Sequence, residues 1–117
     1  MKLYIDTSKN EHFSLSLIKN DKEIDSIEVE SKYRQCEKLL PEIDKILKKN
    51  NLDIKDIKEV EVNDEGEGFS ALRIGVVIAN ALSYALGVPC KAKSGEEIKL
   101  ENYSFVKPKY KAEPNIG

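Results

Sequence analysis

The chain has 117 residues and a mass of 13.2 kDa, which is the size of one small domain. Its 19 basic and 21 acidic side chains leave a formal net charge of -2. This balance argues against a general polyanion binder, which needs a surplus of basic side chains to displace counterions from phosphates. The N-terminal segment carries Asp6 and no apolar run, unlike a signal peptide, and the longest apolar stretch is broken by polar residues. We therefore expect a cytoplasmic protein without a membrane span.

Three segments of alternating polarity open the chain and predict an antiparallel meander of strands. They are Lys2–Asp6, His12–Lys19 and Glu23–Glu30. Asn20 and Asp21 form a tight-turn signal between the second and third strands. In the third strand Ile24 is out of register with Ile27 and Val29, which indicates a β-bulge.

The apolar spacing then changes to that of a helix, from Tyr33 to Lys49, with Ser31 as its N-cap and Pro41 inside it. The next expected elements are a strand at Asp56–Asn63, a loop at Asp64–Gly68, a helix at Phe69–Leu86 and a strand at Val88–Ala92. The order β-β-β-α-β-α-β predicts an α/β fold with a mixed five-stranded sheet and parallel crossovers. We place one lobe at residues 1–92 and a C-terminal arm at residues 93–117, with a short strand or a helical turn near Glu96–Leu100.

The second helix is unusually apolar for this chain. One third of all residues are charged, yet the stretch from Ser70 to Leu86 carries one charge, Arg73. Small side chains recur every fourth position and form a ridge that lets another helix approach closely. These are Ala71, Gly75, Ala79 and Ser83.

A helix that is apolar all round must be covered all round, and a small domain leaves part of it as a partner surface. The alternative, that the domain itself covers this helix on every side, stays open. The residues that we expect at a partner interface are Phe69, Leu72, Arg73, Val76, Val77, Asn80, Tyr84 and, from the first helix, Leu39.

The sequence contains only weak candidates for a catalytic or ligand-binding site. Asp6, Thr7 and Ser8 end the first strand in a hydroxyl-bearing turn, which makes them weak candidates for nucleotide binding, although such a turn more often satisfies its own backbone. The loop Asp64–Gly68 precedes a helix N-terminus, but its two glutamates would repel phosphate. Three aromatic residues of the arm have the chemistry to stack on RNA bases, but packing of the arm is the favoured interpretation. We predict no catalytic residue, no metal site and no cofactor.

Three motifs in unbroken order resemble the TsaB (YeaZ) family. "FSALRIGVVIANALSYALGVP" is similar to that family's G-P-G-S-F-T-G-L-R-I-G signature and the helix after it. "LYIDTSKN" resembles its I-D-T-S opening, and "CEKLLPEIDKILKKNNLDIKDI" resembles its E-x-L-L-P-x-I-x-x-L-L helix. The chain departs from the pattern at Glu65–Gly68, where the family has Gly-Pro-Gly-Ser, at Ser70-Ala71 in place of Thr-Gly, and at Gln35 in place of His. We find no counterpart of the family's second lobe.

The resemblance implies an actin-like ATPase fold related to ribonuclease H. It also implies a role in making N6-threonylcarbamoyladenosine (t6A) at position 37 of tRNAs that read ANN codons. In that pathway TsaB is a non-catalytic partner that pairs through N-lobe helices with the transferase TsaD and works with the ATPase TsaE.

From the resemblance we expect a scaffold or dimerisation subunit that binds a TsaD-like transferase, with a TsaE-like ATPase and a homodimer as further partners. Contact with tRNA would be indirect, through the complex. Two alternatives stay open. One is a nucleotide-binding or glycoprotease-like enzyme of the same fold, and the other is a degenerate homodimeric binding protein outside tRNA modification.

Overall fold

The structure is a computed structural model that describes residues 1–31, 35–66, 69–95, 98–100, 103–105 and 109–110. Side chains are described for residues 1–31, 37–66 and 70–95. The elements are β1 (Lys2–Asp6), β2 (His12–Lys19), β3 (Lys22–Glu30), α1 (Gln35–Lys49), the 3-10 helix η1 (Ile54–Asp56), β4 (Glu59–Val62), β5 (Glu65–Gly66), α2 (Phe69–Leu86), β6 (Cys90–Ala92), β7 (Ile98–Leu100), β8 (Tyr103–Phe105) and β9 (Lys109–Tyr110).

The first three strands form the expected meander. Asn20 and Asp21 have φ angles of 52° and 62°, the positive values that a two-residue turn of type I′ requires. The predicted bulge is confirmed, because Leu17 pairs with Asp25 while the next residue, Ile18, pairs with Glu23. Ile24 is therefore the extra residue of β3, and its side chain is 46% exposed.

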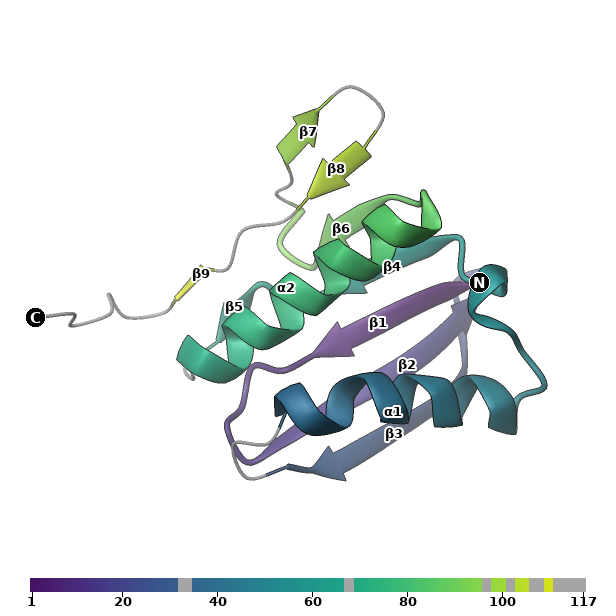
Figure 1. The fold of residues 1–117 in the computed structure, drawn as a ribbon, viewed down its shortest axis with the longest axis horizontal. Helices are drawn as coiled ribbons and strands as arrows, with labels where there is room; N and C mark the ends of the chain where they lie inside the picture. Colours follow the sequence, from purple (N-terminus) through teal and green to yellow (C-terminus); the bar gives the residue numbers. More distant parts are fainter. Residues whose placement is uncertain (32–34, 67–68, 96–97, 101–102, 106–108, 111–117) are drawn as a thin grey trace, which may run out of the picture.

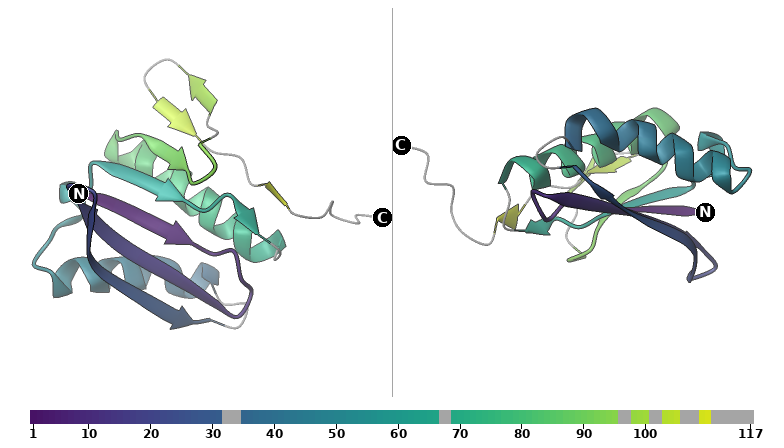
Figure 2. Two further views of the ribbon diagram at one scale, coloured as in Figure 1. Left: turned by 180° about the vertical axis from the view of Figure 1, so that it is seen from behind. Right: turned by 90° about the horizontal axis from the view of Figure 1, so that it is seen from below.

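The main sheet has the strand order β3-β2-β1-β4-β6, with β1 antiparallel to β2 and parallel to β4, and β4 parallel to β6. This confirms the mixed five-stranded sheet. Both helices lie on one face of it (Figure 1). Seen from behind, the opposite face carries no helix among the described residues (Figure 2).

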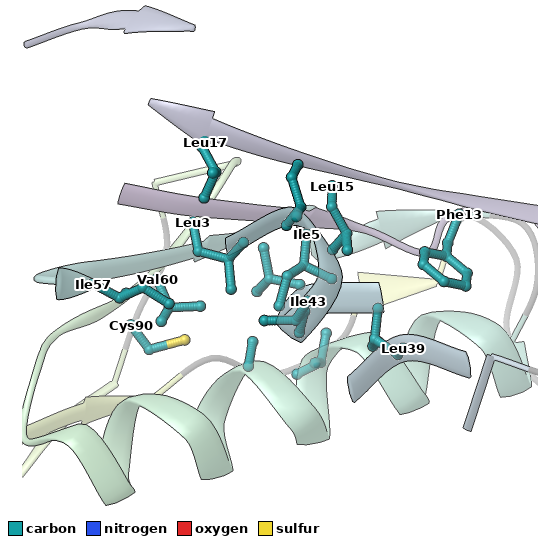
Figure 3. Close-up of a cluster of buried hydrophobic side chains, with 14 of the residues drawn as sticks. Leu3, Ile5, Phe13, Leu15, Leu17, Leu39, Ile43, Ile57, Val60 and Cys90 are labelled. Atoms are coloured by element: carbon teal, nitrogen blue, oxygen red, sulfur yellow. The ribbon is translucent and has the colours of Figure 1, made fainter. Parts of the chain in front are cut away.

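The core lies between the sheet and the two helices (Figure 3). It forms because every second residue of each strand points to the helical side, so that Leu3 and Ile5 of β1 are fully buried together with Val60 and Val62 of β4. The first helix contributes the buried residues Leu39, Ile43, Ile46 and Leu47, at the spacing of one helical face.

Several element boundaries differ from the sequence expectation. The fourth strand begins at Glu59 and not at Asp56, because Asp53 and Asp56 form a capping box that turns Ile54–Asp56 into a 3-10 helix. The last core strand begins at Cys90 and not at Val88. The first helix is described from Gln35, and Tyr33 lies outside the described residues.

Two further predictions concern the N-cap of the first helix and the secondary structure of the arm. Ser31 is buried, and its hydroxyl makes no hydrogen bond within the described part of the chain. The residues that it would cap, 32–34, lie outside the described residues, so the N-cap stays a prediction. Near Glu96–Leu100 the structure has a strand, β7, and it pairs with a second strand that we did not predict, β8. The division of the chain at residue 92 stays a prediction.

Candidate functional site

The second helix presents two different faces. Toward the core, Leu72, Val76 and Ala79 are between 0% and 2% exposed. On the opposite side, Val77 is 57% and Tyr84 is 70% exposed. We call the line of exposed residues at three- and four-residue spacing the outer stripe; it consists of Ser70, Arg73, Val77, Ala81 and Tyr84. The prediction that part of this helix stays uncovered by its own domain therefore agrees with the burial of its residues.

The predicted interface residues divide between these two faces. Arg73, Val77 and Tyr84 belong to the outer stripe, and Asn80 is half-buried beside it. Phe69 begins the helix, but its side chain lies outside the described residues.

Three of the predicted interface residues were wrong. Leu72 and Leu39 are 0% exposed and Val76 is 2% exposed. All three are covered within the domain, so a partner cannot reach them. The sequence could not separate Leu72 and Val76 from the outer stripe, because a helix that is apolar all round has no pattern that marks its inner face. Leu39 lies instead on α1, on the same buried face as Ile43 and Ile46.

The ridge of small residues also lies on the inner face of the helix. Ala71, Gly75, Ala79 and Ser83 are all buried, so the ridge faces the interior of the domain and offers no groove to another protein. At Gly75 the helix approaches the segment after β1 so closely that a Cβ would lie 2.0 Å from the hydroxyl oxygen of Thr7.

The turn after β1 satisfies its own polar groups. The backbone N–H of Ser8 donates to Oδ1 of Asp6 at 2.9 Å, and Nδ2 of Asn63 donates to the same oxygen at 3.3 Å. A Cβ at Gly66 would lie 2.9 Å from Cα of Ser8, so β5 covers the turn closely. This is the self-satisfying turn that the sequence left as the alternative to a phosphate site.

Thr7 is the exception in this turn. Its side chain is fully buried, and its hydroxyl makes no hydrogen bond with any residue that the structure describes. Leaving a buried hydroxyl unpaired costs about 1–3 kcal/mol. The hydroxyl lies against Gly75 of α2, so it points to the helix and not to the surface.

A shallow pocket of about 290 Å³ lies at the carboxyl ends of β4 and β6 and is lined by Asn63, Glu65, Lys93 and Ser94. Behind it the buried carboxylate of Asp64 accepts hydrogen bonds from the hydroxyl of Ser94 at 2.6 Å and from its backbone N–H at 3.2 Å. Oδ1 of Asn63 accepts from the N–H of Glu65 at 3.2 Å. These contacts hold the loops together, and they occupy donors that would otherwise face an anion.

The sheet face opposite the helices carries acidic groups next to Tyr4. Burial raises the pKa of the Tyr4 hydroxyl, and the carboxylates of Asp6, Glu61 and Asp64 raise this pKa further.

The predicted loop Asp64–Gly68 is only partly described. Glu65 and Gly66 form β5, which pairs in parallel with β9, while Glu67 and Gly68 lie outside the described residues.

Two further properties of the described residues bear on the site. Among them no group of three or more His, Cys, Asp or Glu side chains is placed to hold a metal ion. Within the same residues, neither helix combines the length and the apolar character needed to span a bilayer.

The contact between Thr7 and Gly75 was missed by the sequence reasoning. Its signal was a glycine in the middle of a helix, a position where glycine is unfavourable unless something packs closely against it. The partner, 68 positions earlier in the chain, could not be found from the sequence.

Comparisons with known proteins give one family and one fold. The sequence profile described as "TsaD: tRNA N6-adenosine threonylcarbamoyltransferase" matches residues 30–107, more than half of the chain. Among solved structures, YeaZ from Pseudomonas aeruginosa is similar with a TM-score of 0.70 and 22% identity, over 78% of this chain and 42% of that one. A second structure, an uncharacterized protein with similarity to peptidase YeaZ from the same organism, has the same TM-score and identity over 41% of its length.

The chain therefore spans about two fifths of the length of these structures. No curated protein matches it by sequence. The structural similarity confirms the predicted α/β lobe of the ribonuclease H-like, actin-like ATPase type.

Proposed function

The chain belongs to the TsaD family. From this membership, together with the YeaZ-like fold and the TsaB-like motifs, we propose that it is a non-catalytic scaffold or dimerisation subunit in the synthesis of t6A in tRNA. In this role it binds a TsaD-type transferase through the outer stripe of α2. A TsaE-like ATPase acts beside it, and tRNA is contacted only through the assembled complex.

The observation that carries the proposal is the exposure of apolar side chains on α2. Val77 and Tyr84 lie on the surface of a helix that has no acidic residue and one basic residue. Ala81 lies between them and is exposed as well. A contiguous apolar surface on a protein with 34% charged residues is typical of a protein–protein interface.

The state of the turn after β1 supports a non-catalytic role. A phosphate-binding turn needs backbone N–H groups and hydroxyls that face the ligand. Here the N–H of Ser8 is bound to Asp6, and the hydroxyl of Thr7 is buried against α2. Nucleotide binding by Asp6, Thr7 and Ser8 would require these groups to rearrange first.

Size-exclusion chromatography with light scattering, on the chain alone and mixed with the TsaD-type transferase, tests the proposal. We expect a complex whose mass is the sum of its components. A chain that stays monomeric and elutes separately from the transferase at micromolar concentrations would contradict the proposal. Self-association without transferase binding would support the alternative of a homodimeric binding protein.

Calorimetry with ATP and magnesium separates the scaffold from the alternative of a nucleotide-binding enzyme. The proposal predicts no heat of binding from the isolated chain. Saturable binding that is lost in Asp6→Asn would support the enzyme instead, because Asp6 is the carboxylate that organises the turn.

A further inference from the structure

One contact fixes the position of α2 on the sheet. A Cβ at Gly75 would lie 2.0 Å from Oγ1 of Thr7 and 3.0 Å from both Cβ and Cγ2 of the same residue. Real side chains do not approach so closely, so the backbone of the helix lies directly against Thr7. Only glycine permits this distance.

Both sides of the contact are held in place. Thr7 is 0% exposed and directly follows β1, which is hydrogen-bonded to β2 on one side and to β4 on the other. Gly75 lies on the buried line of α2, one turn after Ala71 and one turn before Ala79. An added methyl group therefore has no flexible neighbour to displace, and either the helix or the turn must move.

The outer stripe depends on the same contact. Successive residues of a helix are rotated by about 100°, so Val77 lies on the side of α2 away from Gly75. A helix that is lifted or rotated at Gly75 changes the exposure and direction of Val77, Ala81 and Tyr84 together. The distance between the helix backbone at Gly75 and Thr7 thus determines which side chains form the outer stripe.

We propose that Thr7 and Gly75 are a positioning pair that sets the depth and rotation of α2, and through them the shape of the partner surface. The consequence for binding rests on the proposed function, whereas the position of the helix does not. The buried hydroxyl of Thr7, which has no hydrogen-bond partner among the described residues, then acts by its size alone.

In the substitution Gly75→Ala, helix propensity and the steric contact with Thr7 have opposite effects on the helix. Alanine is a better helix former than glycine, so helix propensity alone would stabilise the variant. Any displacement of α2 must therefore come from contact with Thr7. Thr7→Gly removes all three atoms that the new methyl group would meet, so the double variant Thr7→Gly/Gly75→Ala should restore the wild-type position.

The experiment combines an amide NMR map of α2 with the Kd for the transferase, both measured well below the melting temperature of the least stable variant. In Gly75→Ala we expect amide shifts along the whole of α2 and a Kd about ten-fold higher, equivalent to about 1.4 kcal/mol. The double variant should recover both properties. Ala85→Ser, which adds one atom on the exposed side of the same helix, should shift only its neighbours.

Each outcome decides the proposal. Shifts that stay local in Gly75→Ala, or a double variant that does not recover, would overturn the positioning pair. If Gly75→Ala fails to fold, a folded double variant with the wild-type map supports the pair, and an unfolded one overturns it. If the wild-type chain does not bind the transferase, the proposed function fails, while the NMR map still decides the role of Thr7 and Gly75.

Discussion

The two helices lie on the same face of the sheet but present opposite characters to their surroundings (Figures 1 and 2). The exposed side of α1 carries ion pairs, with Nζ of Lys48 2.8 Å from the carboxylate of Asp44 and Nζ of Lys45 3.3 Å from that of Glu42. The exposed side of α2 carries Val77 and Tyr84. Leu40 is also exposed on α1, but there it stands among charged residues, whereas Val77 and Tyr84 lie on a helix with one charge. This difference is the basis for proposing α2, and not α1, as the partner surface.

The helices are also held in place in different ways. At the end of α1, Nδ2 of Asn50 donates to Asp25 of β3 at 2.8 Å, and Nζ of Lys49 lies 3.4 Å from the same carboxylate. The second helix is held by the close approach of Gly75 to Thr7. Polar contacts tolerate water around them, whereas a backbone contact without intervening side chains fixes one geometry.

The largest expected effect is a difference in stability between substitutions on the two faces of α2. Leu72→Ala removes a fully buried side chain, so the free energy of unfolding should fall by about 2–5 kcal/mol. Val77→Ala should change the free energy of unfolding by less than about 0.5 kcal/mol, because Val77 is on the surface. Urea denaturation measures both, and equal losses would contradict the assignment of the inner face and the outer stripe.

The next prediction compares the outer stripe with α1. Val77→Glu places a charge in the middle of the proposed interface, and we expect the affinity for the transferase to fall about 100-fold, or about 2.7 kcal/mol. Leu40→Glu is the matched control, because Leu40 of α1 is 52% exposed and undergoes the same change. We expect it to alter the affinity by less than about three-fold. Isothermal calorimetry gives both values, and a larger loss at Leu40 would reverse the assignment of the two helices.

We expect the contact of Thr7 with Gly75 to depend on the size of the Thr7 side chain and not on hydrogen bonding by its hydroxyl. Thr7→Val keeps the shape of the side chain and removes the unpaired hydroxyl, so we expect the unfolding free energy to rise by about 1 kcal/mol. Ser94→Ala is the contrast, because its hydroxyl donates to Asp64 at 2.6 Å and its loss should destabilise the protein. Thermal melting distinguishes the two, and destabilisation by Thr7→Val would indicate that the hydroxyl has a polar partner.

The smallest expected effect is a pH-dependent change in stability, which comes from the contacts of Asp25 with Asn50 and Lys49 at the end of α1. The hydrogen bond from Asn50, with a smaller contribution from the charge of Lys49, lowers the pKa of Asp25 below its ordinary value. The ionised carboxylate therefore stabilises the folded state above the unfolded pKa of about 3.9, and this contribution disappears as the pH falls through the lowered folded pKa.

Melting temperatures of the wild type and Asp25→Asn across the acid range measure this contribution. The variant should melt lower near pH 6, and the difference should shrink below about pH 4. A difference that persists unchanged at lower pH would show that the charge of Asp25 is not its cause.

Much of the fold could be predicted from local patterns. The bounds of α2 follow from an apolar run that ends at Gly87, whose φ of 68° favours glycine, and the bulge follows from the misplaced Ile24. The start of β4 could not be predicted, because the capping box of Asp53 and Asp56 interrupts a pattern that reads as a strand.

The candidate site was predicted only in part, for a physical reason. The composition of α2 indicates that some of its surface meets a partner, but it does not say which side. That choice is made by the contact of Gly75 with Thr7, which joins two distant parts of the chain and leaves Leu72 inside and Val77 outside. Packing of this kind is visible only in the folded structure.

The most direct test of the account is the amount of t6A in tRNA from cells that lack the gene for this chain. We expect t6A to fall sharply, to return when the wild-type chain is supplied, and to stay low when Val77→Glu is supplied. An unchanged level of t6A in the cells without the gene would contradict the proposed role.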